Sequence, residues 1–465
     1  MIENNINTQI AILGGGPAGY IAALRTSQLG ANVVLIEEKE LGGVCLNRGC
    51  IPTKALLKTS EVSYTIKKSK EFGIDSIIRN TNWNISTSRK NRVVKNLNMG
   101  LKYLLPAKNI KILKGKGYIK NPKNILVSTS EGEIEVSTEK IIITTGSRPL
   151  IPDISGINLD DVITSNEALN LTEVPKNIAI IGAGAIGLEF ATMFNSIGSK
   201  ITVIEMKDKI LPYEDNEISS ELLKIMKRQG ITFKLSSSVK EIKHTEDGLK
   251  VIYSEKNKES YLKCEKVLIA IGRNLNSDSE EFRNLGLLIE KGAILVDDNM
   301  ETNIKGVYAA GDVIGGKLLA HLAFMEGKVA SENALGIKSR VNYNAVPACV
   351  YTNPEVASVG INEEEAKKLG IGIKIGQFNF RNNGRALTLG EREGFVKIIV
   401  DKDNRIIGGQ ILGINASEII SEVTLAITLQ ARADVLADMI HPHPSLSEAI
   451  WEACADAAGR PLHKL

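Results

Sequence analysis

Residues 9–19 read QIAILGGGPAG, and this stretch decides the fold. Its first half, residues 9–13, is a short apolar run typical of a buried strand, and the alanine-rich segment after the glycines is typical of a helix. A second expected strand, residues 32–36, ends at Glu37. A strand, a glycine turn, a helix, a strand and a terminal acid, in this order, predict a dinucleotide-binding unit.

Three glycines of this turn carry the expected chemistry: Gly14, Gly16 and Gly19. Residues without a Cβ let the turn and the helix start approach a pyrophosphate closely. The negative charge of the pyrophosphate suits the exposed N–H groups at the N-terminus of a helix. Glu37 can then accept hydrogen bonds from a ribose.

The same pattern returns at residues 178–187, which read IAIIGAGAIG. Four positions of this second unit follow their counterparts at one shared offset of 168 residues: Gly182, Gly184, Gly187 and Glu205. One offset shared by four such positions is difficult to attribute to chance, so we expect a second dinucleotide-binding unit. Each unit also has a later apolar strand that ends in a glycine turn, at Gly146 in the first and at Gly272 in the second.

The chain of 465 residues is long for a single domain. Residues 306–312 read as a further strand after the second unit has closed, which indicates that the second unit is inserted in the first. The terminal Asp312 of this strand suits a cofactor hydroxyl. From residue 346 onward, short β-rich runs and helical stretches follow without a nucleotide fingerprint. We therefore predict an α/β fold with two Rossmann-like domains and a C-terminal α+β domain, bounded as follows: 1–150 and 276–345 for the first, 151–275 for the second, and 346–465 for the third.

Two cysteines stand out in residues 42–54, which read GGVCLNRGCIPTK. Cys45 and Cys50 could close a disulfide or bind a soft metal. Five residues of straight helix rise about 7.5 Å, whereas bridged Cα atoms lie about 4.4–6.8 Å apart, so a disulfide here requires a distorted helix start. Gly49 supplies the backbone freedom for that distortion. A structural bridge or a pair of inert thiols remains an alternative, and zinc is disfavoured because no second Cys/His pair stands nearby.

The composition indicates a cytoplasmic protein. The 57 basic and 54 acidic residues give a net charge of +3, which offers no electrostatic reason to expect a nucleic acid or a membrane surface as partner. No apolar run reaches the roughly 18 residues of a spanning helix. The N-terminal residues have neither the basic flank nor the apolar core of a secretory signal. In a reducing compartment, paired cysteines are more often redox-active than structural.

Near the C-terminus, residues 441–448 read HPHPSLSE. His443 and Glu448 are five residues apart, so a carboxylate at a helix start can orient the ring and raise its basicity. His441 is the rival candidate for this role. The His-x-His pair could instead bind a metal.

With these motifs in order, the chain resembles the flavin-dependent disulfide oxidoreductases, and among them the dihydrolipoyl dehydrogenases. The resemblance extends from Ile10 to beyond Glu448. Its motifs are Gly-Gly-x-Cys-x-Asn-x-Gly-Cys-x-Pro at 42–52, Gly-Asp at 311–312, Tyr-Thr-Asn-Pro-Glu at 351–355 and His-Pro-x-x-x-Glu at 443–448. The resemblance implies that the first unit binds FAD, the second binds NAD, and the C-terminal domain forms a homodimer. Each active site then combines cysteines of one subunit with a histidine of the other.

The resemblance also implies roles for individual residues. Cys45 is the interchange thiol and Cys50 lies beside the flavin, while His443, oriented by Glu448, takes a proton from dihydrolipoamide. Residues expected at FAD are Gly14, Gly16, Gly19, Glu37, Lys54, Gly146, Asp312 and Ala320. Residues expected at NAD are Gly182, Gly184, Gly187, Glu189, Glu205 and Gly272. Lys54 is expected to pair with Glu189. The dihydrolipoyl group comes from a carrier domain of a 2-oxo acid dehydrogenase complex or of a glycine cleavage system.

Glu205 favours NAD over NADP, because its charge would repel a 2′-phosphate and accept a hydrogen bond from a 2′-hydroxyl. Lys207 and Lys209 are near enough in sequence to weaken this preference. The main alternative is an NAD(P)H-dependent reductase of a low-molecular-weight disulfide, similar to glutathione reductase. A non-catalytic flavoprotein is disfavoured because both cysteines, His443 and Glu448 are intact. Arg48 and Ser445 depart from the residues usual at these positions in the family.

Overall fold

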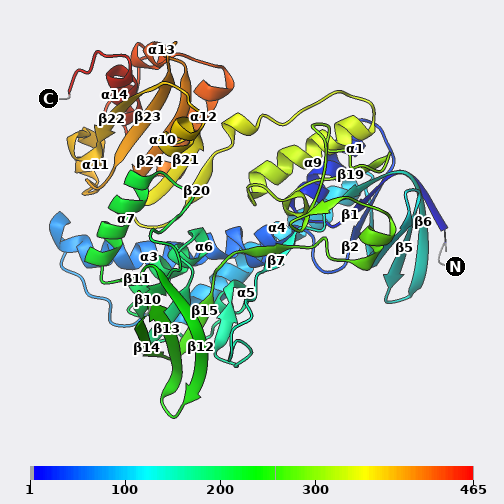
Figure 1. Cartoon of the computed structure of the whole chain (residues 1–465), viewed down its shortest axis with the longest axis horizontal. Helices are drawn as coiled ribbons and strands as arrows, with labels where there is room; N and C mark the ends of the chain where they lie inside the picture. Colours follow the sequence, from blue (N-terminus) through cyan, green and yellow to red (C-terminus); the bar gives the residue numbers. More distant parts are fainter. Residues whose placement is uncertain (1–4, 257, 464–465) are drawn as a thin grey trace. The chain divides into compact units, whose positions relative to one another are not determined.

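The structure is a computed structural model that describes residues 5–256 and 258–463. The chain folds into two compact units (Figure 1), each built from three stretches of sequence. The first unit consists of Met1–Ala55, Asn84–Leu150 and Gly272–Val341. The second unit consists of Leu56–Trp83, Ile151–Ile271 and Asn342–Leu465.

The first unit contains a seven-stranded sheet of order β3-β2-β1-β6-β5-β4, with β19 paired to β6. Strands β1, β2, β3, β6 and β19 run parallel, whereas β4 and β5 are antiparallel additions. The strands of this sheet are β1 (Asn5–Leu13), β2 (Val33–Glu37), β3 (Lys111–Lys114), β4 (Lys116–Asn121), β5 (Asn124–Thr129), β6 (Gly132–Ile143) and β19 (Val307–Ala309). The other elements that lie in or enter this unit are α1 (Pro17–Gln28), α2 (Gly43–Arg48), α3 (Cys50–Lys68), α4 (Trp83–Ala107), β7 (Ser147–Pro149), β16 (Arg273–Leu275), α8 (Glu280–Asn284), β17 (Ile289–Glu290), β18 (Ala293–Ile294) and α9 (Ala320–Ala334).

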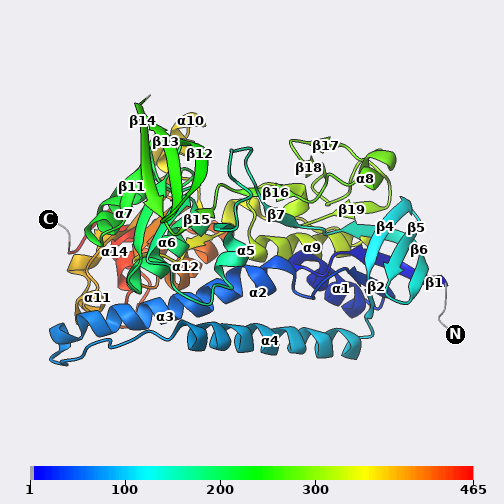
Figure 2. The same cartoon turned by 90° about the horizontal axis from the view of Figure 1, so that it is seen from below.

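Strands β2 and β19 and the C-terminal ends of β1 and β6 are buried on both faces, as their apolar runs predict. Along β1, Ile10 and Ile12 join one apolar cluster and Ala11 and Leu13 join another. Helices α1 and α9 contribute the alanine-rich cover of the first of these faces (Figure 2). The sequence places small residues on α1, and these let the helices pack close to the sheet.

The register of the sheet places the carboxyl ends of four strands, β1, β2, β6 and β19, side by side. Leu13, the last residue of β1, pairs with Ile36 on β2 and with Ile143 on β6, and Ile143 pairs with Ala309 on β19. The glycine turn, the acid after β2 and the loop after β19 therefore leave the sheet at the same edge. Ligands of open α/β sheets bind at such carboxyl ends, where the strand order switches.

The second unit contains a five-stranded parallel sheet of order β11-β10-β9-β15-β8, which repeats the β2-β1-β6 pattern of the first unit. Its elements are β8 (Val162–Thr164), α5 (Ser165–Ala168), β9 (Asn177–Ile181), α6 (Ala185–Ser196), β10 (Lys200–Ile204), α7 (Asn216–Arg228), β11 (Thr232–Lys234) and β15 (Lys266–Ile269). A three-stranded antiparallel sheet accompanies it: β12 (Ser237–Thr245), β13 (Gly248–Glu255) and β14 (Lys258–Cys264).

The C-terminal part of the second unit is an antiparallel sheet of order β20-β21-β24-β23-β22 with helices packed on it. Its elements are β20 (Ala348–Val350), β21 (Glu355–Gly360), α10 (Glu363–Lys368), β22 (Ile373–Asn379), α11 (Gly384–Thr388), β23 (Phe395–Asp401), β24 (Ile406–Gly413), α12 (Ala416–Thr428), α13 (Ala433–Ala437) and α14 (Glu448–Ala457). The predicted fold class is confirmed: two parallel nucleotide-type sheets and an α+β C-terminal part. The pairing of β19 with β6 confirms that the second nucleotide fold is inserted in the first. Among the described residues, no helix is both long and apolar enough to cross a bilayer.

Candidate active site

Cys45 and Cys50 lie on two consecutive helices, Cys45 within α2 and Cys50 at the first position of α3. Gly49 separates the helices with backbone angles of φ −144° and ψ −112°. A Cβ on Gly49 would lie 3.1 Å from the carbonyl oxygen of Val44, a tight contact that favours glycine at the break. The expected distortion is thus a full helix break, and it brings two half-buried sulfurs close to disulfide distance.

A hydrogen bond joins the two sulfurs. This bond to Cys50, together with burial, raises the pKa of the Cys45 thiol well above its usual range. Cys45 therefore keeps its proton and donates it toward the sulfur of Cys50. Tyr20 lies near this pair, and burial is the main cause that raises the pKa of Tyr20 to about 12.

The dithiol segment is fastened to the first glycine turn. The Gly42 N–H donates to the carbonyl of Gly15 at 2.8 Å. Gly43 has φ 58°, and a Cβ on it would lie 2.7 Å from the Cα of Gly16. Backbone therefore packs on backbone here, and the two cysteines lie beside the expected cofactor cradle.

Two asparagines fix the same segment: Asn47, which belongs to the cysteine motif, and Asn98, which the sequence did not single out. Asn47 Nδ2 donates to the carbonyls of Leu41 and Gly43 at 2.8 Å and 2.9 Å. The buried Asn98, on α4, donates from Nδ2 to the carbonyl of Leu41 at 2.7 Å. Buried amides that satisfy backbone carbonyls hold a loop in one conformation.

The first glycine turn has the geometry of a phosphate cradle. Gly14 has φ 109°, and a Cβ on it would lie 2.3 Å from the carbonyl oxygen of Thr144. A Cβ on Gly19 would lie 1.8 Å from the carbonyl oxygen of Gly14. Gly16 caps α1 without a side-chain hydrogen bond, so the N–H groups of the first turn face outward for an anion. Glu37 closes the cradle, because its carboxylate accepts from the Gly15 N–H at 2.6 Å.

Asp312 is held by two residues that sequence reasoning missed. Ser147 Oγ donates to Asp312 Oδ2, and Arg273 Nε donates to Ser147 Oγ at 2.7 Å. Burial lowers the pKa of the Arg273 guanidinium, while the charges of Asp312 and Cys50 oppose this shift. Arg273 is therefore a buried cation near both groups. The sequence offered no signal for it beyond its place after Gly272.

The other residues expected at FAD lie in the same unit. Ala320 is the first residue of α9, whose N-terminus also lacks a side-chain cap. Gly146 has φ 72°, and a Cβ on it would meet nothing within 4 Å. Lys54 lies on α3, one turn after Cys50. The unfilled helix starts and the glycine cradle fit a dinucleotide such as FAD.

The second glycine turn repeats this geometry. Gly182 has φ 106°, and a Cβ on it would lie 2.4 Å from the carbonyl oxygen of Ala270. Gly184 caps α6 without a side-chain bond, and a Cβ on Gly187 would lie 2.1 Å from the carbonyl oxygen of Gly182. Glu205 accepts from the Ala183 N–H at 2.7 Å, just as Glu37 accepts from Gly15.

The loop after Glu205 directs its two lysines away from the acid. Lys209 Nζ donates to the carbonyl of Glu214 at 3.0 Å and to Asn216 Oδ1 at 2.7 Å. Lys207 Nζ lies over the Tyr213 ring at 4.8 Å, while its backbone N–H donates to Glu205 Oε1 at 2.8 Å. The lysines are thus committed to other partners, which supports the preference for NAD expected from Glu205.

Glu189 and Gly272 complete the set expected at NAD. Glu189 is buried on α6, and its carboxylate accepts from the Tyr351 N–H at 3.1 Å. Gly272 has φ 133° and begins the third stretch of the first unit. Lys54 belongs to the first unit and Glu189 to the second. The expected pairing of Lys54 with Glu189 stays a prediction.

His443 and Glu448 form a hydrogen-bonded pair in the second unit. His443 Nδ1 lies 2.8 Å from Glu448 Oε1, and the Ser445 N–H donates to Glu448 Oε2 at 2.7 Å. Burial raises the pKa of Glu448, but the bonds from His443 and Ser445 outweigh it and lower that pKa below its usual value. The His443 side chain is 80% exposed, and its Nε2 has no hydrogen-bond partner among the described residues. That nitrogen is available to take a proton.

The rival His441 is committed elsewhere. Its Nε2 lies 2.8 Å from Glu422 Oε1 and its Nδ1 lies 3.1 Å from the carbonyl oxygen of Met439. Its side chain is only 3% exposed. The geometry therefore favours His443 over His441 as the base.

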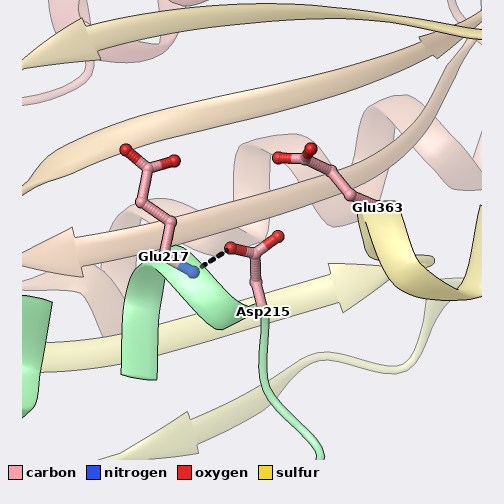
Figure 3. A group of neighbouring side chains, drawn as sticks. All are labelled: Asp215, Glu217 and Glu363. Carbon is pink, nitrogen blue, oxygen red and sulfur yellow. Dashed lines mark hydrogen bonds between the residues drawn. The ribbon is translucent and has the colours of Figure 1, made fainter. Parts of the chain in front are cut away.

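One acidic group within the described ranges has the spacing of a metal site, and Figure 3 shows it: Asp215, Glu217 and Glu363. It includes neither the cysteines nor the histidines named above. The ammonium group of the buried Lys397 lies among these carboxylates, 3.1 Å from Asp215, 2.7 Å from Glu217 and 2.5 Å from Glu363. Burial lowers the pKa of Lys397, but the bonds to the carboxylates outweigh it and raise that pKa. A protein cation therefore occupies the position that a metal would take.

Comparisons with known proteins define the class. Residues 8–327 match the model of the pyridine nucleotide-disulphide oxidoreductase family, and residues 346–454 match the dimerisation domain of the same family. The chain belongs to the pyridine nucleotide-disulphide oxidoreductase family. It is therefore an oxidoreductase, and its dimerisation domain makes it a homodimer.

Individual relatives agree over nearly the whole chain. Dihydrolipoyl dehydrogenase of Bacillus subtilis is 40% identical over 470 residues, which cover 98% of each chain. The solved structure of LpdA from Mycobacterium tuberculosis matches with a TM-score of 0.90 at 26% identity, covering 97% of this chain and 99% of that one. The flavoprotein disulfide reductase RclA from Escherichia coli, solved as a copper(II) complex, matches with a TM-score of 0.86 at 31% identity, covering 97% and 99%. The resemblance to this family and its cofactors, FAD and NAD, is confirmed.

Proposed function

We propose that the protein is a dihydrolipoyl dehydrogenase, which reoxidises protein-bound dihydrolipoamide through Cys45 and Cys50 and passes the electrons to NAD⁺ through FAD. The observation that carries the proposal is the contact of the dithiol segment with the first glycine turn, where Gly43 packs on Gly16. A dithiol fixed against a dinucleotide cradle can exchange electrons with the bound ring. Relatives with this name at 38–40% identity over nearly the full chain support the choice of substrate.

The reaction begins with proton transfer at His443. Its Nε2 takes a proton from one thiol of dihydrolipoamide, and the resulting thiolate attacks the Cys45 sulfur of the Cys45–Cys50 disulfide. The disulfide breaks and Cys50 leaves as a thiolate. The second substrate thiol then attacks the mixed disulfide, which closes the lipoyl disulfide and returns Cys45 as a thiol.

The residues are suited to these roles. Cys50 begins α3, where the positive end of the helix dipole and the nearby Arg273 stabilise a thiolate. Cys45 holds its proton in the reduced pair, as its raised pKa indicates. When bound, FAD and NAD⁺ supply the two-electron chemistry that carries the reducing equivalents away from the dithiol.

Each active site is proposed to combine Cys45 and Cys50 of one subunit with His443 of the other. The His443 ring is exposed, and a base in open water would not be shielded from competing proton transfer. Apolar side chains in the same part of the unit are also exposed: Ile440 is 96% exposed, and Leu425 and Leu429, at the C-terminal end of α12, are 58% and 68% exposed. Burying such residues is a task for the second subunit.

The substrate is proposed to arrive on a lipoylated carrier domain of a 2-oxo acid dehydrogenase complex or of a glycine cleavage system. We also propose that the protein acts in the cytoplasm, since redox-active rather than structural cysteine pairs are typical of a reducing compartment. Within the described residues, no group of three or more His, Cys, Asp or Glu side chains at metal-binding distance includes Cys45 or Cys50.

An anaerobic titration tests the proposed function. Dihydrolipoamide added to the purified holoprotein should change the flavin spectrum, and NAD⁺ added afterwards should restore it. The alternative, an NAD(P)H-dependent reductase of a low-molecular-weight disulfide, requires the opposite result: no response to dihydrolipoamide, and reoxidation of the NADPH-reduced protein by a small disulfide such as glutathione disulfide.

A further inference from the structure

The first histidine of the HPHP segment, His441, is buried and engaged at both ring nitrogens. His441 Nδ1 faces the carbonyl oxygen of Met439 at 3.1 Å, and Nε2 faces Glu422 Oε1 at 2.8 Å. A carbonyl and a carboxylate both accept hydrogen bonds, so neither ring nitrogen is left to receive a proton from a substrate. His441 is therefore fixed in place by two acceptors, whereas His443 presents a nitrogen to the outside.

The segment between α13 and α14 is anchored from both sides of His443. Before it, Glu422 on α12 holds His441. After it, Glu448 at the start of α14 holds both the His443 ring and the Ser445 N–H. The buried Asn383 adds a third anchor, because its Nδ2 donates to the carbonyl of Ser445 at 3.0 Å.

The anchors on the two sides differ in what they hold. Glu448 touches the His443 ring itself, so it orients the base directly. Glu422 instead bonds to His441, which stands two residues before His443 in the chain with Pro442 between the two histidines. Proline fixes its own φ, so the backbone between His441 and His443 has little rotational freedom. The position of His441 therefore restricts the position of His443.

We propose that Glu422 and His441 are positioning residues, which direct the exposed nitrogen of His443 toward the dithiol of the second subunit. This inference rests on the proposed function, because it gives the pair a task in the dihydrolipoamide half-reaction. The charge of Glu422 strengthens its hydrogen bond to the ring, as charge-assisted bonds are about twice as strong as neutral ones.

The position of Glu422 on α12 agrees with this task. Leu425 and Leu429 follow it by three and seven residues, so all three side chains lie on one face of the helix. The two leucines are exposed in the single chain and Glu422 is partly exposed. The pair thus lies next to apolar surface that a second subunit can cover, which is where a base acting across the dimer has to be aimed.

The test compares two half-reactions in the purified holoenzyme. Glu422→Ala and His441→Ala should each slow reduction by dihydrolipoamide by roughly 10-fold, within the 100-fold that a 1 Å misplacement can cost. Reduction by NADH should stay at the wild-type rate, because it does not use His443. The double variant should lose no more than either single variant, since both act through one hydrogen bond. A merely structural role would lower both half-reactions together.

Conservative and control variants make the test decisive. Glu422→Gln keeps an oxygen acceptor without charge, so it should restore part of the rate lost in Glu422→Ala. Glu418→Gln is the matched control, because Glu418 lies one turn earlier on α12 and is exposed. If the alanine variants do not fold, Glu422→Gln compared with Glu418→Gln decides. Equal dihydrolipoamide rates in these two variants would overturn the inference, as would an equal loss in both half-reactions. A wild type that dihydrolipoamide does not reduce would instead contradict the proposed function.

Discussion

The dithiol and the histidine–glutamate pair are held in opposite ways. Cys45 and Cys50 are half-buried between two helices and packed against the glycine turn of their own unit. His443 is 80% exposed on a loop, and its free nitrogen meets no other described residue. The dithiol and its glycine turn come from one chain, whereas the exposed His443 is proposed to be covered by a second subunit. The proposed division of the active site between two subunits requires dimerisation for activity, and the predictions below test that division.

The largest effect is expected at the buried half. Replacing either cysteine by serine should abolish lipoamide-linked turnover and leave FAD bound, because the proposed FAD site consists of the glycine turn and Asp312 rather than the cysteines. In Cys45→Ser, the Cys50 thiolate at the start of α3 should give long-wavelength charge-transfer absorbance with the flavin at neutral pH. In Cys50→Ser this absorbance should be absent. Absorption spectra of the two purified variants check the prediction, and a band in Cys50→Ser alone would reverse the two roles.

The exposed half should show a smaller and more selective effect. Removing a positioned base costs about 10²–10⁴ in rate, so His443→Ala should slow reduction by dihydrolipoamide by that factor. Flavin reduction by NADH should remain near normal because it does not require the base. Glu448→Ala should give a smaller loss of the same kind, since it removes only the group that orients the ring. Stopped-flow measurements of both half-reactions check this, and an equal slowing by NADH would contradict the assigned role.

The buried half of the site was the more predictable from sequence, for a physical reason. Gly14 and Gly182 have φ values of 109° and 106°, and a Cβ would meet carbonyl oxygen at either position. Such positions accept glycine and little else, so the glycines can be recognised as a motif in the sequence. The expected break beside Cys50 has the same local origin in Gly49.

Contacts between segments that are distant in the sequence could not be predicted from a motif in this way. Ser147 and Asp312 are 165 residues apart, and Asn98 reaches Leu41 from 57 residues away. The choice between His441 and His443 also depended on Glu422, 19 residues earlier. The sequence alone could name both histidines and both lysines near Glu205, but only packing shows which of them are already engaged.

A third prediction concerns a substitution at Glu205, which leaves the cysteines and the His443–Glu448 pair unchanged and alters only the preference for NAD⁺ or NADP⁺. The wild type should prefer NAD⁺, and Glu205→Arg should shift the ratio toward NADP⁺ by about 1–3 kcal/mol, or roughly 10- to 200-fold. The effect comes from replacing an acid that repels a 2′-phosphate with a cation that pairs with it. Steady-state kcat/KM for both nucleotides measures the shift. Equal use of both by the wild type would mean that Lys207 or Lys209 leaves its present partner and neutralises the acid.

The smallest expected effect, about a factor of two, tests the division itself. Inactive Cys45→Ser and His443→Ala proteins, carrying different tags, are mixed under conditions that exchange subunits, and the heterodimer is purified. In a two-fold symmetric dimer, one site then carries both defects and the other carries none. Each heterodimer should therefore recover about half of the wild-type activity, whereas each parent homodimer stays inactive. If proven heterodimers remain inactive, each site is built within one chain, and the exposed His443 must reach the cysteines of its own subunit.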